Sequence, residues 1–231
     1  MSDAPVGFPI YASGKTDSSR AVIVIQEAFG VNHHIRSVAD RYADEGYLAV
    51  APQLFHRDGS PEIPYDDYAS AMPLMAKLTK QGLTDDLNAT TDFLATLGFR
   101  APNVAAVGFC MGGTVAFFAA TLGTVGAAAS FYGGGLATGR FGIPPLIELA
   151  ADLTAPWLGL YGDLDQSIPV DQVEALREAT DAASVPTEIV RYAEGQHGFH
   201  CDARPDSFNE VAAADAWARA LAFFDEHLRD K

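Results

Sequence analysis

Short apolar runs alternate with helix-patterned segments along most of the chain, and this alternation restricts the fold more than any other feature. Buried strands are predicted at 21–26, 48–52, 103–109, 125–133, 156–162 and 187–192. Helices are predicted at 32–47, 84–98, 113–123, 145–152, 170–183 and 206–228. Such alternation implies a mostly parallel, doubly wound sheet with helices on both faces, in one α/β domain spanning 1–231.

Charge and composition exclude several classes of function. The formal net charge is −15, with 30 acidic and 15 basic residues, so the chain repels a phosphate backbone and nucleic-acid binding is not expected. No apolar run is long enough to span a bilayer, and the amino end lacks the pattern of a signal peptide. Two cysteines are too few for a disulfide framework. A cytoplasmic protein without membrane or nucleic-acid partners is therefore expected, and the sequence predicts no particular oligomeric state.

Three chemically active side chains follow three of the predicted strands. Cys110 follows the strand at 103–109, Asp165 the strand at 156–162, and His197 the strand at 187–192. Active sites of such sheets lie at the carboxyl ends of the strands. The order nucleophile, acid, histidine is that of the α/β-hydrolases, which predicts this fold and a Cys-His-Asp catalytic triad.

The segment around Cys110 reads G-x-C-x-G-G, which is typical of a strained turn between a strand and a helix. Such a turn pushes its central side chain into the cleft, and glycine is required at Gly108 and Gly112 because larger residues would collide. The amides at the start of the following helix stabilise negative charge, and they therefore favour a thiolate on the cysteine. For the same reason, the Met111 N–H is expected to bind a developing oxyanion. The Ala28 N–H is its expected partner.

Alternatives exist for the acid and for the base. Asp163 lies two residues before Asp165, which is preferred because it sits further into the loop. His200 competes with His197, which is preferred because its glycine-flanked loop can reach across the cleft. The remaining histidines are expected in loops or on helix surfaces: His33, His34, His56 and His227. The His33–His34 pair and the spacing of His197 and His200 suggest a metal, but no carboxylate or cysteine cluster completes a site, so none is predicted.

The least regular part of the chain is 53–82. The stretch "DGSPEIPYDDY" is expected to be a loop, and "ASAMPLMAKLTKQ" a helix broken near Pro73. A segment of this kind beside a cleft is expected to cover the pocket and to decide specificity.

Four stretches of the chain strongly resemble the dienelactone hydrolase (carboxymethylenebutenolidase) family: "VIVIQEAFGVNHHIRSVADRYADEGYLAVAPQLFHR", "VAAVGFCMGGTVAFFAA", "YGDLDQSIP" and "YAEGQHGFH". The resemblance runs from about residue 20 to 225 and implies an α/β-hydrolase fold with Cys110, Asp165 and His197 as the triad. It also implies that Glu27, in the Q-E motif, engages the resting thiol until substrate binds. A carboxylate beside a thiol opposes thiolate formation, which agrees with such a role; alternatively, Glu27 only tethers a loop.

One position departs from the family. Characterised members hold a substrate carboxylate with arginines, one of them four residues after the catalytic histidine, where this chain has Cys201. No arginine occurs from 58 to 98, and the nearest candidates, Arg57 and Arg204, are out of register. Dienelactone itself is therefore in doubt, while hydrolysis of a small ester or lactone remains the expectation.

The expected enzyme is a hydrolase of small esters or lactones that forms a thioester on its cysteine and needs no cofactor. Phe29, Tyr132 and Met111 are expected to wall the pocket, and Cys201 is expected to face it and to react with thiol reagents. Two other classes of protein remain open. One is a receptor that binds a small lactone without turnover, and the other is a redox protein in which Cys201 resolves oxidised Cys110.

Overall fold

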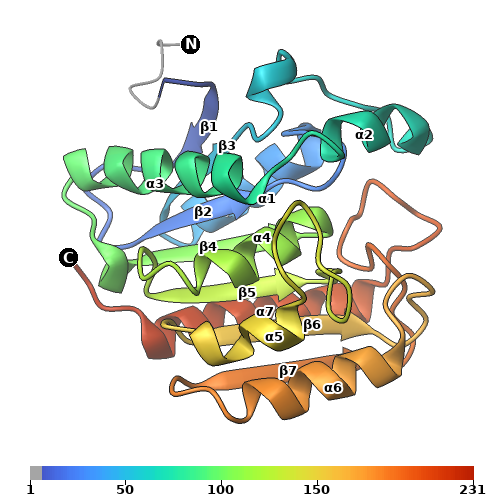
Figure 1. The fold of residues 1–231 in the computed structure, drawn as a ribbon. Helices are drawn as coiled ribbons and strands as arrows, with labels where there is room; N and C mark the ends of the chain where they lie inside the picture. The colour runs from blue at the N-terminus through green and yellow to red at the C-terminus, as the bar shows by residue number, and fades with distance from the viewer. Residues whose placement is uncertain (1–6) are drawn as a thin grey trace.

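Across residues 7–231, the part of the chain that the computed structural model describes, seven strands form one mixed sheet (Figure 1). Their order is β1-β3-β2-β4-β5-β6-β7, and β1 alone among them runs antiparallel to its neighbour. The strands are β1 (Ile10–Ser13), β2 (Ala21–Ile25), β3 (Leu48–Pro52), β4 (Val104–Phe109), β5 (Ala127–Phe131), β6 (Trp157–Gly162) and β7 (Thr187–Tyr192). The predicted α/β-hydrolase fold class is confirmed, and all six predicted strands are present.

Helices cover both faces of the sheet. In Figure 1, α3, α4, α5 and α6 lie in front of it, and α1 and α7 lie behind. The helices are α1 (His33–Asp44), α2 (Tyr68–Met75), α3 (Lys80–Thr96), α4 (Met111–Ala119), α5 (Leu146–Leu149), α6 (Val170–Thr180) and α7 (Glu210–His227), with 3-10 turns η1 (His56–Asp58), η2 (Ala101–Asn103) and η3 (Ala150–Asp152). The Tyr42 and Trp217 rings, 4.4 Å apart, join α1 to α7. Because both faces are covered, strands β2 to β6 are buried along their whole length.

Helix boundaries follow capping chemistry, with two corrections. Asn32 caps α1 as expected, since its side chain accepts from the Ile35 N–H at 3.2 Å. The helix predicted to begin at Thr84 starts instead at Lys80, because Thr79 is the residue whose hydroxyl accepts from a free amide. The Thr84 hydroxyl bonds the carbonyl of Lys80 within the helix. The helix predicted from Gly113 begins at Met111, directly after Cys110.

β1 was not among the predicted strands. It is a four-residue edge strand, and none of its residues is fully buried. Its short sequence therefore carries no run of buried apolar residues, and its pairing with β3 is what makes it a strand.

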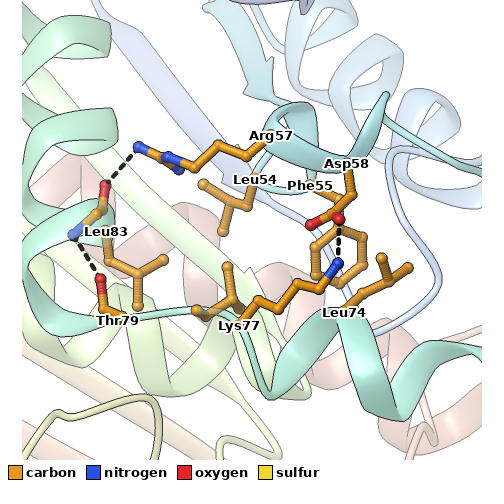
Figure 2. Close-up of a pocket in the computed structure, with 10 residues that line it drawn as sticks. Leu54, Phe55, Arg57, Asp58, Leu74, Lys77, Thr79 and Leu83 are labelled. Atoms are coloured by element: carbon orange, nitrogen blue, oxygen red, sulfur yellow. Dashed lines mark hydrogen bonds and ion pairs between the residues drawn. The ribbon is translucent and has the colours of Figure 1, made fainter.

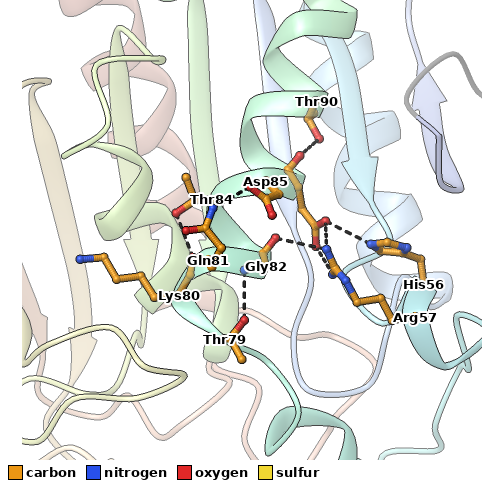
Figure 3. Close-up of polar contacts among 10 residues, drawn as sticks. His56, Arg57, Thr79, Lys80, Gln81, Gly82, Thr84, Asp85 and Thr90 are labelled. Carbon is orange, nitrogen blue, oxygen red and sulfur yellow. Dashed lines mark hydrogen bonds and ion pairs between the residues drawn. The ribbon is translucent and has the colours of Figure 1, made fainter.

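Ion pairs and apolar packing hold the irregular 53–82 segment against the rest of the protein. His56 and Arg57 of η1, which are labelled in Figure 3, reach the side chain of Asp86 on α3, with N–O distances of 3.1 Å from His56 and 2.7 Å from Arg57. Figure 2 shows a small cavity between η1, α2 and the start of α3, floored by Leu54, Phe55 and Leu83. The helix expected to break near Pro73 runs through that proline and ends at Met75.

In the described residues, no helix combines the length and the apolar character needed to cross a membrane. The expectation about the amino end concerns residues 1–6 in part, and those residues lie outside the described chain.

Candidate active site

The turn that carries Cys110 connects β4 directly to α4, and only glycine fits on either side of it. Cys110 has φ +56°, a conformation that non-glycine residues rarely adopt. A Cβ atom on Gly108 would lie 1.8 Å from the carbonyl oxygen of Gly112, and one on Gly112 would lie 2.4 Å from that of Ile25. The prediction that glycine is required at these two positions is confirmed. The close approach of β2, β4 and α4 leaves the partly exposed Cys110 thiol at the floor of a cleft.

Two loops from neighbouring strands bring Asp165 and His197 together. The Leu164 N–H donates to the Gly195 carbonyl at 2.9 Å, and a Cβ on Gly162 would collide with that oxygen at 2.3 Å. His197 Nδ1 lies 2.6 Å from Asp165 Oδ2. Ser167 supports the same carboxylate, because its amide and hydroxyl donate to Asp165 Oδ1 at 2.8 and 2.7 Å. With Nδ1 occupied, Nε2 is the ring nitrogen that remains for Cys110.

The charges of the three side chains reinforce one another. Burial by itself would lower the pKa of His197, but the negative charges of Cys110 and Asp165 and the hydrogen bonds to both outweigh it and raise the pKa to about 10. Burial would likewise raise the pKa of Asp165, but its hydrogen bonds from His197 and Ser167 hold it below the ordinary value. Once the Cys110 thiol has passed its proton to His197, the imidazole therefore retains that proton while Asp165 stays ionised.

The alternative acid and base are engaged elsewhere. Asp163 forms a two-bond ion pair with Arg191 of β7, at 2.7 and 2.8 Å, on the outside of the loop. His200 is buried, with its Nε2 3.5 Å from the Arg41 guanidinium. Burial and the nearby positive charges of Arg41 and His34 hold the pKa of His200 well below the ordinary value, so it is a poor base.

One of the other histidines is not where the sequence suggested. His34 was expected in a loop or on a helix surface, but its side chain is buried and its Nδ1 lies 3.1 Å from Asp202 Oδ1. The expectation is wrong because the helix turns this residue towards the sheet, where its ring lies 5.9 Å from that of His200. The pairing joins α1 to the loop that carries His197.

The two residues whose amides are predicted to bind an oxyanion are Ala28 and Met111. Ala28 follows β2, Met111 directly follows Cys110 at the start of α4, and both residues are fully buried. Within residues 7–231, neither amide donates a hydrogen bond to another group of the protein. Free amides at the start of a helix stabilise negative charge, so both remain candidates for binding an oxyanion.

Glu27 is buried in a polar cluster beneath the cleft. Its carboxylate accepts from the Tyr65 hydroxyl at 3.0 Å and from the Tyr132 hydroxyl at 3.4 Å. The Cys201 thiol donates to the Tyr65 oxygen at 3.3 Å. Among the described residues, no hydrogen bond joins Glu27 to Cys110, so the role that the family resemblance implies for Glu27 stays a prediction.

The walls of the cleft differ in part from those predicted. The cleft has a volume of about 810 Å³ and includes Cys110, Asp165, His197 and Phe29 among its lining residues. Tyr132 and Met111 are fully buried behind this surface rather than on it. Tyr132 acts there through its bond to Glu27.

The expectation that Cys201 faces the cleft is wrong. Its side chain is 0% exposed and makes no part of the cleft surface. Burial, followed by the charge of Glu27, raises the pKa of the Cys201 thiol to about 12, so almost no thiolate is present near neutral pH.

Sequence reasoning missed two functional residues and left a third open. Tyr65 lines the cleft and ties Glu27 to Cys201, and Arg140 lines the cleft from the loop after β5. Arg204, left open above, also lines it, with its guanidinium 5.9 and 5.7 Å from the rings of Phe29 and Tyr65. Within residues 7–231, neither arginine is paired with a carboxylate. No local motif marks these residues, because loops of different elements bring them together.

The fold and this arrangement define a class of protein: an α/β-hydrolase, in which the strained turn at Cys110 follows a central strand. A model of the dienelactone hydrolase family matches residues 8–228, and the chain belongs to that family. It is therefore a carboxylic ester or lactone hydrolase of the dienelactone hydrolase type.

Similar proteins cover nearly the whole chain. A protein of Salmonella typhimurium assigned as a carboxymethylenebutenolidase is 38% identical over 208 residues, which are 89% of this chain and 77% of that one. A Synechocystis protein with the same assignment is 37% identical over 213 residues, 90% of this chain and 86% of that one. A crystal structure assigned as a dienelactone hydrolase from Klebsiella pneumoniae superposes with a TM-score of 0.84 at 36% identity, covering 95% of this chain and 93% of that one.

Proposed function

We propose that Cys110, His197 and Asp165 hydrolyse a small ester or lactone through a thioester on Cys110. His197 takes the proton from Sγ, and the thiolate attacks the carbonyl carbon to form a tetrahedral oxyanion between the Ala28 and Met111 amides. The oxyanion collapses, and the alkoxide leaves with the proton from His197. His197 then activates a water that attacks the thioester, releasing the acid and restoring the thiol.

The observation that carries this proposal is the 2.6 Å contact between His197 Nδ1 and Asp165 Oδ2 at the cleft that also contains Cys110. The contact selects the tautomer in which Nε2 can exchange a proton with the thiol. Membership of a hydrolase family and the strained turn at Cys110 give independent support.

Trapping the acyl-enzyme tests the mechanism directly. When the protein is mixed with an activated aryl ester and quenched with acid during the first turnover, the peptide that contains Cys110 should gain one acyl group. Peptide mass spectrometry measures the gain, and Cys110→Ala provides the control without a nucleophile. Acylation of Ser167, the hydroxyl beside Asp165 in the cleft, would contradict a cysteine nucleophile.

Glu27 is proposed to favour the protonated, thiol form of Cys110 in the resting enzyme. Its buried carboxylate lies beneath the cleft and raises the pKa of Tyr132, although burial of that tyrosine is the larger cause. A fixed negative charge here opposes a second charge on a thiol, which limits stray oxidation of the site.

Arg204 is expected to select substrates that carry a free carboxylate. Arg204→Gln keeps the side-chain stem over the rings of Phe29 and Tyr65 but removes the charge. Loss of a charge-assisted hydrogen bond should raise KM for a carboxylate-bearing ester about tenfold. Steady-state kinetics with a neutral ester of the same size gives the control, since its KM should stay within about twofold of wild type. Equal losses for both esters would show that Arg204 only supports the loop.

The two other classes of protein make different predictions. A receptor that binds a lactone would show no ester turnover that depends on His197, so His197→Ala would change nothing measurable. A redox protein would form a disulfide between Cys110 and Cys201 under mild peroxide. The burial of Cys201 and its raised pKa disfavour that reaction, because the resolving thiol must reach the sulfur as a thiolate.

A further inference from the structure

A second hollow adjoins the catalytic cleft and has no part in the chemistry described above. It has a volume of about 380 Å³ and lies between α2 and the turn at 139–142. Tyr68 and Arg140 line both this hollow and the cleft, so the two spaces lie next to each other. In Figure 1, α2 lies apart from the helices that cover the sheet.

Several large apolar side chains line this hollow, together with polar atoms that include those of Arg140, and the hollow is partly open to solvent. Met72 is 56% exposed and Tyr68 is 48% exposed, two of the few large apolar side chains that the described chain leaves in water. Met75 and Phe141 complete the apolar lining. Exposed apolar surface next to a catalytic cleft indicates a place where an apolar ligand group is bound. Methionines suit this use because their flexible side chains adapt to ligands of different shape.

A strained turn carries Phe141, which lines the hollow. Arg140 and Ile143 form an isolated antiparallel bridge, and the Ile143 N–H donates to the Arg140 carbonyl at 2.8 Å. The two residues between them, Phe141 and Gly142, have φ +58° and +73°. A tight turn with two positive φ values strongly prefers asparagine and glycine, and a bulky aromatic at its first central position is an outlier. Strain of this kind persists where the side chain has a use, which here is to wall the hollow.

The position of the hollow decides which half of an ester could enter it. His197 must protonate the leaving alcohol, so the alcohol side of the substrate lies towards the loops at 163–167 and 196–207. Those loops line the cleft, and none of their residues lines the hollow. The hollow lies instead beside α2, so the acyl part of an ester bound at Cys110 is the part that could enter it.

We propose that the hollow between α2 and the 139–142 turn binds the acyl chain of the substrate. The preferred substrates are then esters of medium-length apolar acids, whose chain passes Tyr68 and Arg140 and ends among Met72, Met75 and Phe141. This inference rests on the proposed function and adds a substrate class to it. The irregular segment around α2 thereby sets specificity.

A series of p-nitrophenyl esters from acetate to octanoate tests the proposal. The quantity to measure is the ratio of kcat/KM for octanoate to that for acetate. Each buried methylene can raise kcat/KM about fourfold at most, so a half-open groove should raise the wild-type ratio to about ten or more. Lengthening the alcohol of alkyl acetates instead should give no comparable gain.

Two variants and a matched control locate the effect. Met72→Asp places a charge in the groove and should lower the ratio by about fivefold or more. Ser70→Asp adds the same charge to α2 two residues away, on another side of the helix, and should keep the wild-type ratio. Phe141→Asn removes the apolar wall but restores a residue that the turn prefers. It should lower the ratio while the thermal midpoint stays within a few degrees of wild type.

The outcomes separate this proposal from the one on which it rests. No hydrolysis of acetate by the wild-type protein would overturn the proposed function itself. Hydrolysis of acetate with a flat ratio, or a gain that follows the alcohol chain, would overturn only the acyl-chain site. A wild-type dimer in sedimentation that Met72→Asp converts to a monomer, with the ratio unchanged, would show that a second copy of the chain covers the hollow.

Discussion

Cys110→Ala is expected to lower kcat/KM for a short aryl ester by about 10⁴-fold or more, because no other group can then form the thioester. The cleft, the amides of Ala28 and Met111 and the pair of His197 and Asp165 all remain. Residual activity should therefore come from binding and oxyanion stabilisation alone. Initial rates under saturating and limiting ester measure the effect.

Stability provides the control for that experiment. Cys110 has φ +56°, so Cys110→Gly should relieve strain that Cys110→Ala retains. The glycine variant is expected to be equally inactive and about 1 kcal/mol more stable than the alanine variant in urea denaturation. An alanine variant that folds fully and keeps wild-type activity would exclude Cys110 as the nucleophile.

Asp165→Asn is expected to lower kcat by about 10² to 10⁴-fold, while the fold persists. Its carboxylate both orients His197 and helps to raise the pKa of that ring to about 10. An amide of the same size has no charge, and it can also present its N–H₂ to Nδ1, which leaves the wrong tautomer facing Cys110.

The rate–pH profile gives this variant a signature that unfolding would not produce. A thiolate–imidazolium pair is lost when the ring gives up its proton, so activity should fall as pH rises through the pKa of His197. Removing the negative charge lowers that pKa, and the basic limb should move to lower pH. The matched variant is Asp163→Asn, whose carboxylate pairs with Arg191 outside the cleft. Its profile should keep the wild-type position, and equal shifts in both variants would contradict the assignment of Asp165.

The strand pattern and the elbow could be predicted because they depend on local physics. Buried parallel strands are continuous apolar runs, and the Cys110 turn requires glycine wherever a Cβ would meet backbone atoms, as at Gly108. Asp165 and His197 could be named as candidates because both follow strands that end at one edge of the sheet. Pairing them required the structure, since the Gly162–Gly195 contact that joins their loops spans residues far apart in the sequence.

Other parts of the site could not be predicted, because they depend on whether a side chain points into the protein interior or into the cleft. Cys201 and His200 follow His197 closely, yet both turn into the interior. Arg140 reaches the cleft from a glycine-rich loop that has no recognisable motif. The neighbouring sequence does not distinguish a buried thiol from one that lines a cleft.

By itself, the sequence determined the layered α/β fold, the elbow at Cys110 and the order of the three triad candidates, because periodicity and steric demands act over a few neighbouring residues. Only the tertiary structure decided that Asp165 rather than Asp163 contacts His197, that Cys201 is buried beneath the cleft, and that Phe141 walls a second hollow. Those outcomes follow from the packing of distant loops against one another, and a short stretch of chain contains no information on what will pack against it.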